Sequence, residues 1–105
     1  MKTSLFISFG VALAFSGAEA WGGDVEAGGE RYSENCVNCH GKTGRGMASF
    51  PALEGREHAY IAERLRTYRA KEMVGPNSAI MMSLVEDLSD DEIDNLAAYI
   101  ATSFP

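Results

Sequence analysis

The chain has 105 residues, of which 9 are basic and 15 are acidic, so its formal net charge is −6. An excess of acidic side chains is unfavourable beside phosphate groups, which argues against nucleic acid or an anionic membrane surface as the main partner. The length predicts a single domain.

The first 20 residues have the pattern of a secretory signal peptide. Lys2 precedes an apolar run at 5–15, and Ala18-Glu19-Ala20 forms an A-x-A cleavage signal. The run is shorter than the roughly 20 apolar residues that span a bilayer. We expect cleavage after Ala20 and a mature domain of residues 21–105 in the periplasm, with no membrane span. Cleavage removes one base and one acid, so the net charge would stay at −6.

A helix is predicted from about Asp24, a possible N-cap, to Cys39. One face of that helix would carry Val25, Gly28, Tyr32 and Cys36. A glycine inside a helix costs about 1 kcal/mol relative to alanine, so Gly28 and Gly29 indicate a packing requirement.

The two cysteines of the chain lie in the sequence CVNCH at 36–40. A redox-active dithiol of the thioredoxin type belongs to a βαβ unit, and no strand alternation is visible. A structural zinc site needs four ligands, and the chain offers only Cys36, Cys39, His40 and the isolated His58. In contrast, C-x-x-C-H places two thiols and an imidazole where a c-type haem needs them. The pattern therefore favours haem attachment.

Beyond the cysteines, glycines and Pro51 mark a loop at 41–55. A loop of this length in a small domain is expected to wrap around something. A helix follows from about His58 to Lys71, with His58 exposed at its start, and Gly75-Pro76-Asn77 then ends the pattern.

The last predicted helix begins at Ser89, which forms a capping box with Glu92. Its apolar stripe consists of Ile93, Leu96, Ala97 and Ile100, with Tyr99 beside it. With helical spacing throughout, the predicted fold class is all-α.

Charge is unevenly distributed along the chain. Basic residues crowd 56–71, whereas the acidic residues at 86–94 have no base among them. This acidic run is either a solvated surface or a face that orients a basic partner.

The sequence CVNCHG, together with Gly28-x-x-x-Tyr32, PALEG at 51–55 and LSDDEIDNLAAYI at 88–100, resembles small bacterial class I cytochromes c. The stretches YIAERLRTYR at 60–69 and AIMMSLVEDLSDDEI at 79–93 are most similar to the haem subunit of flavocytochrome c sulfide dehydrogenase and related monohaem domains. The resemblance implies three to four short helices around one covalently bound haem c. It also implies that Gly28 and Tyr32 pack against Leu96 and Tyr99.

Roles for individual residues follow from the same resemblance. Cys36 and Cys39 would form the thioether bonds, and His40 would be the proximal ligand of the iron. The carbonyl of Pro51 would accept a hydrogen bond from His40 Nδ1–H, a contact that orients the ligand.

The distal ligand is expected to be a methionine, because a thioether favours ferrous iron and suits an electron carrier. Candidates after residue 20 are Met47, Met73, Met81 and Met82. Family members place the ligand eight residues before the helix-capping serine, which selects Met81, with Met82 as the alternative. The sequence departs from its relatives near YRAKEM, so the conformation of residues 70–80 stays open.

The expected function is one-electron transfer rather than catalysis. The protein would be the haem subunit of, or the carrier for, a respiratory or sulfur-oxidising chain, with redox proteins and a flavoprotein subunit as partners. The alternative is a freely diffusing carrier without a permanent partner. A gas-binding or sensor haem is a third possibility that requires an absent or labile distal ligand.

Overall fold

The computed structural model describes residues 10 and 22–105. Apart from Gly10, the expected signal peptide lies outside the described residues, so its cleavage stays a prediction. The described part contains helices and one isolated bridge between Met47 and Phe50, and it confirms the all-α prediction. None of its helices is long and apolar enough to cross a membrane. The helices are α1 (Val25–Asn35), α2 (Val37–His40), α3 (His58–Arg69), α4 (Ser78–Val85) and α5 (Asp90–Ser103).

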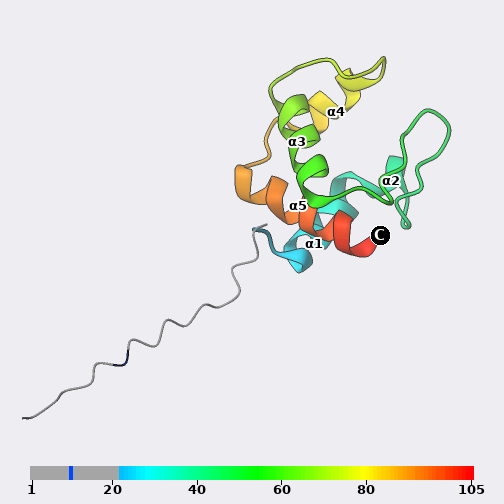
Figure 1. The fold of residues 1–105 in the computed structure, drawn as a ribbon. Helices are drawn as coiled ribbons and strands as arrows, with labels where there is room; N and C mark the ends of the chain where they lie inside the picture. The colour runs from blue at the N-terminus through cyan, green and yellow to red at the C-terminus, as the bar shows by residue number, and fades with distance from the viewer. Residues whose placement is uncertain (1–9, 11–21) are drawn as a thin grey trace, which may run out of the picture.

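The first and last helices pack against each other, as the resemblance implies (Figure 1). A Cβ atom on Gly28 would overlap the backbone carbonyl of Asn95, so only glycine allows this close approach. The ring centroids of Tyr32 and Tyr99 lie 5.4 Å apart, and Tyr32 is buried in the same core cluster as Leu96. The glycine thus permits the crossing, and the aromatic rings fill the space beside it.

Both predicted helix caps are present. The Asp24 carboxylate accepts hydrogen bonds from the backbone N–H groups of Glu26 and Ala27 at the start of α1. At the start of α5, Ser89 Oγ accepts from Glu92 N and Ser89 N donates to the Glu92 carboxylate, both over 3.1 Å. These contacts satisfy N–H groups that have no partner inside the helix.

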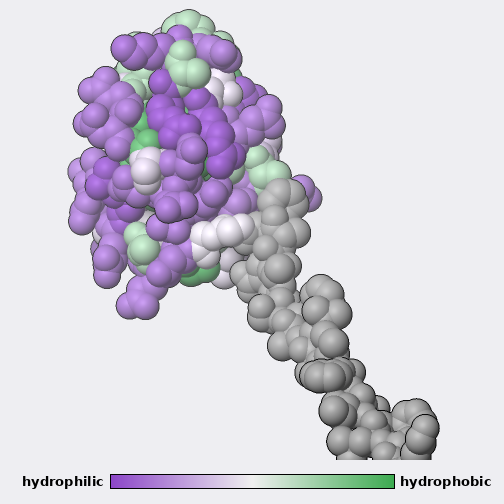
Figure 2. Space-filling model, turned by 90° about the vertical axis from the view of Figure 1, so that its left-hand side faces the viewer, coloured by the Kyte–Doolittle hydropathy of each residue, from purple (hydrophilic) through white to green (hydrophobic). Residues whose placement is uncertain are grey.

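A single core lies between α3 and α5, with Tyr32 of α1 joining it from one end. The apolar face of α3 meets that of α5 there, so both helices bury one side. Figure 2 shows a face of the molecule that is mainly hydrophilic, with apolar residues as separate spots. The largest fully buried side chains are those of Tyr32, Ile93 and Leu96.

Two predicted helix boundaries were wrong. The first helix ends at Asn35, because Cys36 forms a turn (φ −115°, ψ −33°) before α2 begins. The middle helix ends at Arg69, and Lys71 has a left-handed backbone (φ 62°) that no helix can continue through. The helix α4 was not anticipated, because no side chain caps its first turn from Asn77.

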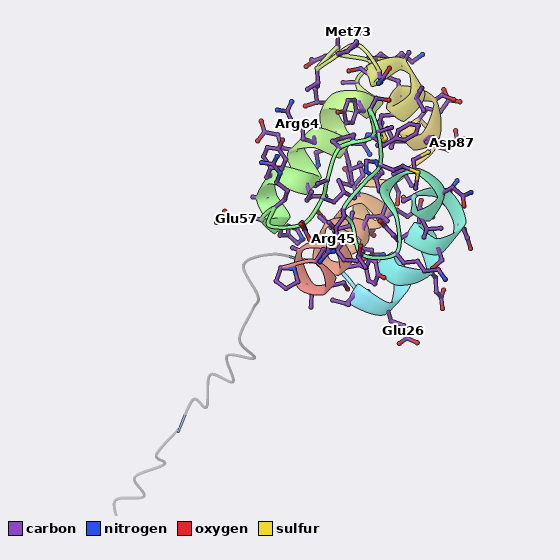
Figure 3. All side chains as sticks on the ribbon, turned by 90° about the vertical axis from the view of Figure 1, so that its right-hand side faces the viewer. Glu26, Arg45, Glu57, Arg64, Met73 and Asp87 are labelled. Atoms are coloured by element: carbon purple, nitrogen blue, oxygen red, sulfur yellow. The ribbon has the colours of Figure 1, made fainter. Side chains whose placement is uncertain are left out.

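The acidic run at 86–94 is partly neutralised by arginines from other helices. Because these pairs join residues distant in sequence, local spacing could not reveal them. Glu86, Asp87 and Asp91 form no ion pair within the described part, and Figure 3 shows Asp87 at the molecular surface. The three pairs are Arg31–Glu92 (3.5 Å), Arg66–Asp94 (2.9 Å) and Arg69–Asp90 (2.6 Å).

Candidate haem site

The sequence CVNCH folds into a turn followed by the single-turn helix α2. The backbone N–H groups of Cys39 and His40 donate to the carbonyl of Cys36, over 3.3 and 3.0 Å. Gly41 ends the helix with a left-handed backbone (φ 86°). This arrangement places both sulfur atoms and the imidazole in the wall of one cavity.

The two cysteines are free thiols, and the surroundings of Cys36 do not suit a redox switch. Burial raises the pKa of the Cys36 thiol to about 11; Cys39 also raises it, while Arg31 acts in the opposite direction. A reactive dithiol needs a thiolate at neutral pH, so its pKa must be lowered rather than raised.

His40 is buried, with only 6% of its surface exposed, and its ring orientation is set by one hydrogen bond. Its Nδ1 lies 2.8 Å from the carbonyl oxygen of Pro51. A carbonyl can only accept, so Nδ1 must carry the proton and donate. In the neutral ring with this tautomer, the other nitrogen, Nε2, carries a lone pair that can bind a metal.

Pro51 reaches this position because the preceding loop folds back on itself. Gly46 has φ 70°, and a Cβ there would overlap the carbonyl of Phe50. Its N–H donates to the His40 carbonyl over 2.8 Å, and Phe50 N donates to Met47 O over 2.8 Å. The loop therefore encloses the proximal side of the cavity.

The structure separates the four methionine candidates. Met47 and Met73 are 54% and 67% exposed, and Figure 3 shows Met73 at the outer edge of the molecule. Met81 packs against the core cluster and lines the same cavity as His40. Met82, the next residue of α4, does not line that cavity.

The cavity itself has the size and polarity of a cofactor pocket. Its volume is about 430 Å³, within the range of about 300–1000 Å³ that small-molecule sites occupy. Its imidazole and methionine thioether groups are donors that suit a haem iron, and its two thiols suit covalent attachment of the haem. The residues present therefore fit the cofactor. The apolar part of the lining comes mainly from Leu53, Ile61, Leu65, Leu96 and Ile100.

Positive charge gathers in one part of the cavity lining. The guanidinium carbons of Arg56 and Arg64 lie 4.8 and 5.3 Å from the ring centroid of Tyr60. Arg64 Nε also donates to the Tyr60 hydroxyl over 3.3 Å. Neither arginine takes part in an ion pair within the described part, so both can receive a negatively charged group.

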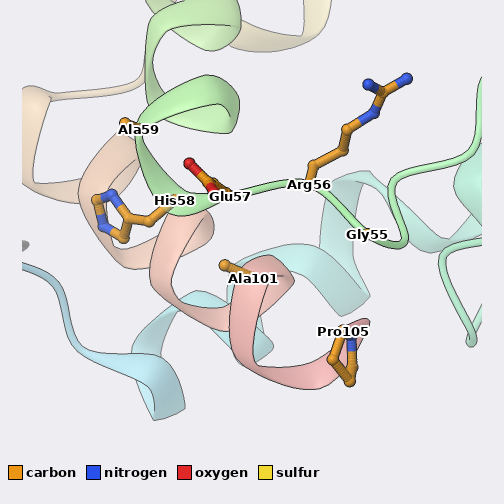
Figure 4. Close-up of a pocket in the computed structure, with 7 residues that line it drawn as sticks. All are labelled: Gly55, Arg56, Glu57, His58, Ala59, Ala101 and Pro105. Atoms are coloured by element: carbon orange, nitrogen blue, oxygen red, sulfur yellow. The ribbon is translucent and has the colours of Figure 1, made fainter.

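A second depression of about 500 Å³ lies where α3 begins and α5 ends (Figure 4). It contains His58, which is half-buried rather than exposed as predicted, with Nε2 3.0 Å from the carbonyl of Gly22. His58 does not line the cavity of Cys36 and Cys39. Within the described residues, no three His, Cys, Asp or Glu side chains form a metal-binding cluster. The zinc alternative therefore finds no support there.

Sequence reasoning did not single out Tyr60, Arg64 or Ser78, which also line the cavity. Arg64 could have been noticed as an arginine one turn after an aromatic residue, at the i, i+4 spacing that brings side chains together. Ser78 carries no comparable signal, because no acidic residue follows it at capping-box spacing.

Comparison with known proteins agrees with this geometry. The chain matches the cytochrome c family over residues 25–104. It is 36% identical to cytochrome c-554(548) of Halomonas halodenitrificans over 81 residues, covering 76% of this chain and 96% of that one. It is also 36% identical to cytochrome c-554(547) of Halothiobacillus neapolitanus over 88 residues, covering 76% of this chain and 97% of that one.

A third relative is the thiosulfate dehydrogenase electron acceptor of Stutzerimonas stutzeri, 36% identical over 73 residues. That match covers 69% of this chain but 34% of the relative. The family comprises electron carriers rather than enzymes, and its members hold a covalently bound c-type haem. The chain therefore belongs to the cytochrome c family, as a small all-α protein that carries one covalently attached haem and transfers electrons.

Proposed function

We propose that Cys36 and Cys39 hold the haem through two thioether bonds, with His40 and Met81 as the axial ligands of its iron. The observation that carries the proposal is that all four side chains line one cavity of cofactor size. When bound, the haem supplies one-electron chemistry at its iron. The protein residues hold it in place and determine which groups reach the metal.

On the proximal side, His40 would bind the iron through Nε2. The hydrogen bond from Nδ1–H to the Pro51 carbonyl holds the ring in one orientation and makes Nε2 a stronger donor. On the distal side, the soft thioether of Met81 would favour the ferrous state and raise the reduction potential. With His40 and Met81 both bound to the iron, no coordination site would be open to a substrate, which would suit an electron carrier rather than a sensor.

Arg56 and Arg64 are suited to the two carboxylates that haem carries. Guanidinium groups bind carboxylates with paired hydrogen bonds. Here the two arginines lie against Tyr60 in the cavity lining and have no carboxylate partner in the described part of the chain. Their charge would offset that of the cofactor at this edge of the cavity.

We further propose that the protein works in the periplasm as the electron acceptor of a sulfur-oxidising or respiratory dehydrogenase. Two observations support this: the signal-peptide pattern at 1–20, and relatives named as thiosulfate dehydrogenase electron acceptors in Stutzerimonas stutzeri and Thiomonas intermedia. A flavoprotein of the sulfide dehydrogenase type is the donor that the sequence resemblance favours.

A freely diffusing carrier is the second candidate function. It is favoured by the cytochromes c-554, since the matches span 96% and 97% of their lengths and leave no room for a second domain. A permanent subunit should copurify with a flavoprotein in a complex that withstands gel filtration, whereas a carrier should elute as a monomer. Flavin and haem absorbance across the same fractions distinguishes the two.

Intact mass after denaturation tests the covalent part of the proposal. The protein from a periplasmic fraction should begin at Trp21 and have the mass of the chain plus one haem. The double variant Cys36→Ala/Cys39→Ala should lose the haem on acid–acetone extraction. Haem that stays attached to this variant would contradict the assignment of the two cysteines.

A further inference from the structure

Ser78, the first residue of α4, has a buried hydroxyl that forms hydrogen bonds with the backbone of the segment before the helix. Only 3% of Ser78 is exposed, and its Oγ lies 2.8 Å from the backbone N atoms of both Val74 and Gly75. A hydroxyl oxygen has two lone pairs and can accept both hydrogen bonds. The Ser78 N–H in turn donates to the Gly75 carbonyl over 3.1 Å. Together these bonds close residues 74–78 into a compact turn.

The same residue begins the inward face of α4. Met81 and Val85 follow Ser78 at i+3 and i+7, so the three share one side of the helix. Ser78 and Val85 are buried and Met81 is partly buried against the core, whereas Ile80 and Leu84 are exposed along the cavity that Met81 also lines. Ser78 and Met81 therefore lie on the same side of α4. If the helix turned about its own axis, Met81 would leave the cavity and Ser78 would become exposed.

The two ends of α4 are held by different contacts. After its last turn, Arg69 donates from Nη1 to the Leu88 carbonyl over 3.0 Å and from Nη2 to Asp90 over 2.6 Å. At the first turn, the N-cap residue Asn77 makes no side-chain capping bond. The Ser78 hydroxyl provides the side-chain contact at this end.

We infer that Ser78 is a positioning residue, whose hydroxyl holds the start of α4 in the orientation that presents Met81 to the cavity. The inference rests on the proposed ligation by Met81. A methionine side chain has three rotatable bonds and adapts easily, so the location of its sulfur depends on where the backbone is held. Loosening the turn at 74–78 should raise the fraction of molecules in which Met81 has left its position.

The test compares the Ser78→Ala holoprotein with wild type. The substitution leaves two inward-facing N–H groups without an acceptor, and opening the turn to water would satisfy them. We expect carbon monoxide to bind the ferrous protein about ten-fold faster. The long-wavelength absorbance band of methionine bound to ferric haem should also disappear at a lower temperature than in wild type.

Ser89→Ala is the matched control, because it removes a serine hydroxyl that caps α5, away from Met81. It should lower the unfolding temperature of the holoprotein but leave carbon monoxide binding within about two-fold of wild type. If Ser78→Ala also lowers the unfolding temperature without changing carbon monoxide binding, Ser78 is merely structural and the inference is overturned.

A third variant, Met81→Ala, distinguishes failure of the inference from failure of the ligand assignment. If Met81→Ala keeps the methionine band, the proposed ligation is wrong and the inference falls with it. If Met81→Ala loses the band while Ser78→Ala binds carbon monoxide at the wild-type rate, the ligation stands and only the role of Ser78 is refuted.

Discussion

The α1–α5 crossing and the α4 segment position cavity residues by different means. At the crossing, backbones touch directly: Gly28 lies against Asn95, and the rings of Tyr32 and Tyr99 pack beside them. In the α4 segment, few buried side chains contribute, and hydrogen bonds from Ser78 hold the turn that precedes the helix.

This difference has a consequence for the two axial positions. His40 lies on α2, the short helix after α1, and is further held by Pro51, whereas Met81 lies on a helix of 8 residues that packs mainly against α3. Regions with few buried apolar contacts open locally at lower free energy than the core does. The distal ligand should therefore detach well before the proximal one.

The largest effect is expected from an added methyl group at the crossing. Gly28→Ala forces a Cβ into the carbonyl of Asn95, and should reduce the free energy of unfolding by about 3 kcal/mol. The matched variant is Gly75→Ala in the turn before α4, where a Cβ meets nothing within 4 Å. It should change the stability by about 0.5 kcal/mol or less. Denaturant titrations of the two holoproteins measure both; equal losses would contradict the comparison.

A smaller effect is expected from Tyr32→Phe. The Tyr32 hydroxyl donates to the carbonyl of Gly41, the residue after His40, over 2.6 Å. Its removal leaves that carbonyl without this partner and should cost about 1 kcal/mol. Thermal unfolding checks this value. The methionine band should persist in the folded protein, because the change is on the proximal side; its loss would show that the two regions are not independent.

The raised pKa of Tyr32 predicts that the free energy of unfolding depends on pH. Burial is the main cause that raises the pKa of Tyr32 from 10.0 to about 12. As pH rises between these values, the unfolded chain loses the phenol proton and the folded protein keeps it, so the free energy of unfolding falls. In Tyr32→Phe the free energy of unfolding should fall less over this pH range, because the variant has no phenol proton to lose. Urea titrations of both proteins from pH 9 to about 12 test it, and parallel curves would show that Tyr32 does not ionise differently on unfolding.

The smallest effect concerns an exposed ion pair. Arg66→Gln removes the pair with Asp94, which joins α3 to α5, and should cost about 0.5 kcal/mol at low salt. Adding salt should reduce the difference, since exposed charges are screened. Unfolding curves at two salt concentrations measure this; a loss that is large and independent of salt would indicate a contact other than the ion pair.

Local sequence patterns were sufficient to predict the helix that begins with a capping box and the close helix contact at a glycine. The capping box of Ser89 and Glu92 predicts the start of α5, and Gly28 predicts a close approach, because each rule depends on residues near in sequence. No glycine or proline marks the end of α1 at Cys36 in the sequence. It could not be predicted because the turn depends on how α2 meets the loop.

For α4 and its surroundings, tertiary contacts decide the structure. The helix lacks a capping side chain at Asn77, and its apolar residues do not form one stripe, because Ile80 and Leu84 line the cavity while Val85 is buried in the core. Arg69 reaches Leu88 and Asp90 from another helix, at separations of 19 and 21 residues. The spacing of residues in the sequence cannot predict such long-range pairs. The conformation of residues 70–80 therefore could not be predicted from the sequence alone.

The central claim is that His40 and Met81 are the two axial ligands in one cavity. Absorbance of the ferric holoprotein in the long-wavelength band of methionine-bound haem tests it most directly, in Met81→Ala beside Met82→Ala. The band should disappear in Met81→Ala and persist in Met82→Ala, because only Met81 lines the cavity with His40. Loss of the band in Met82→Ala alone would contradict the account.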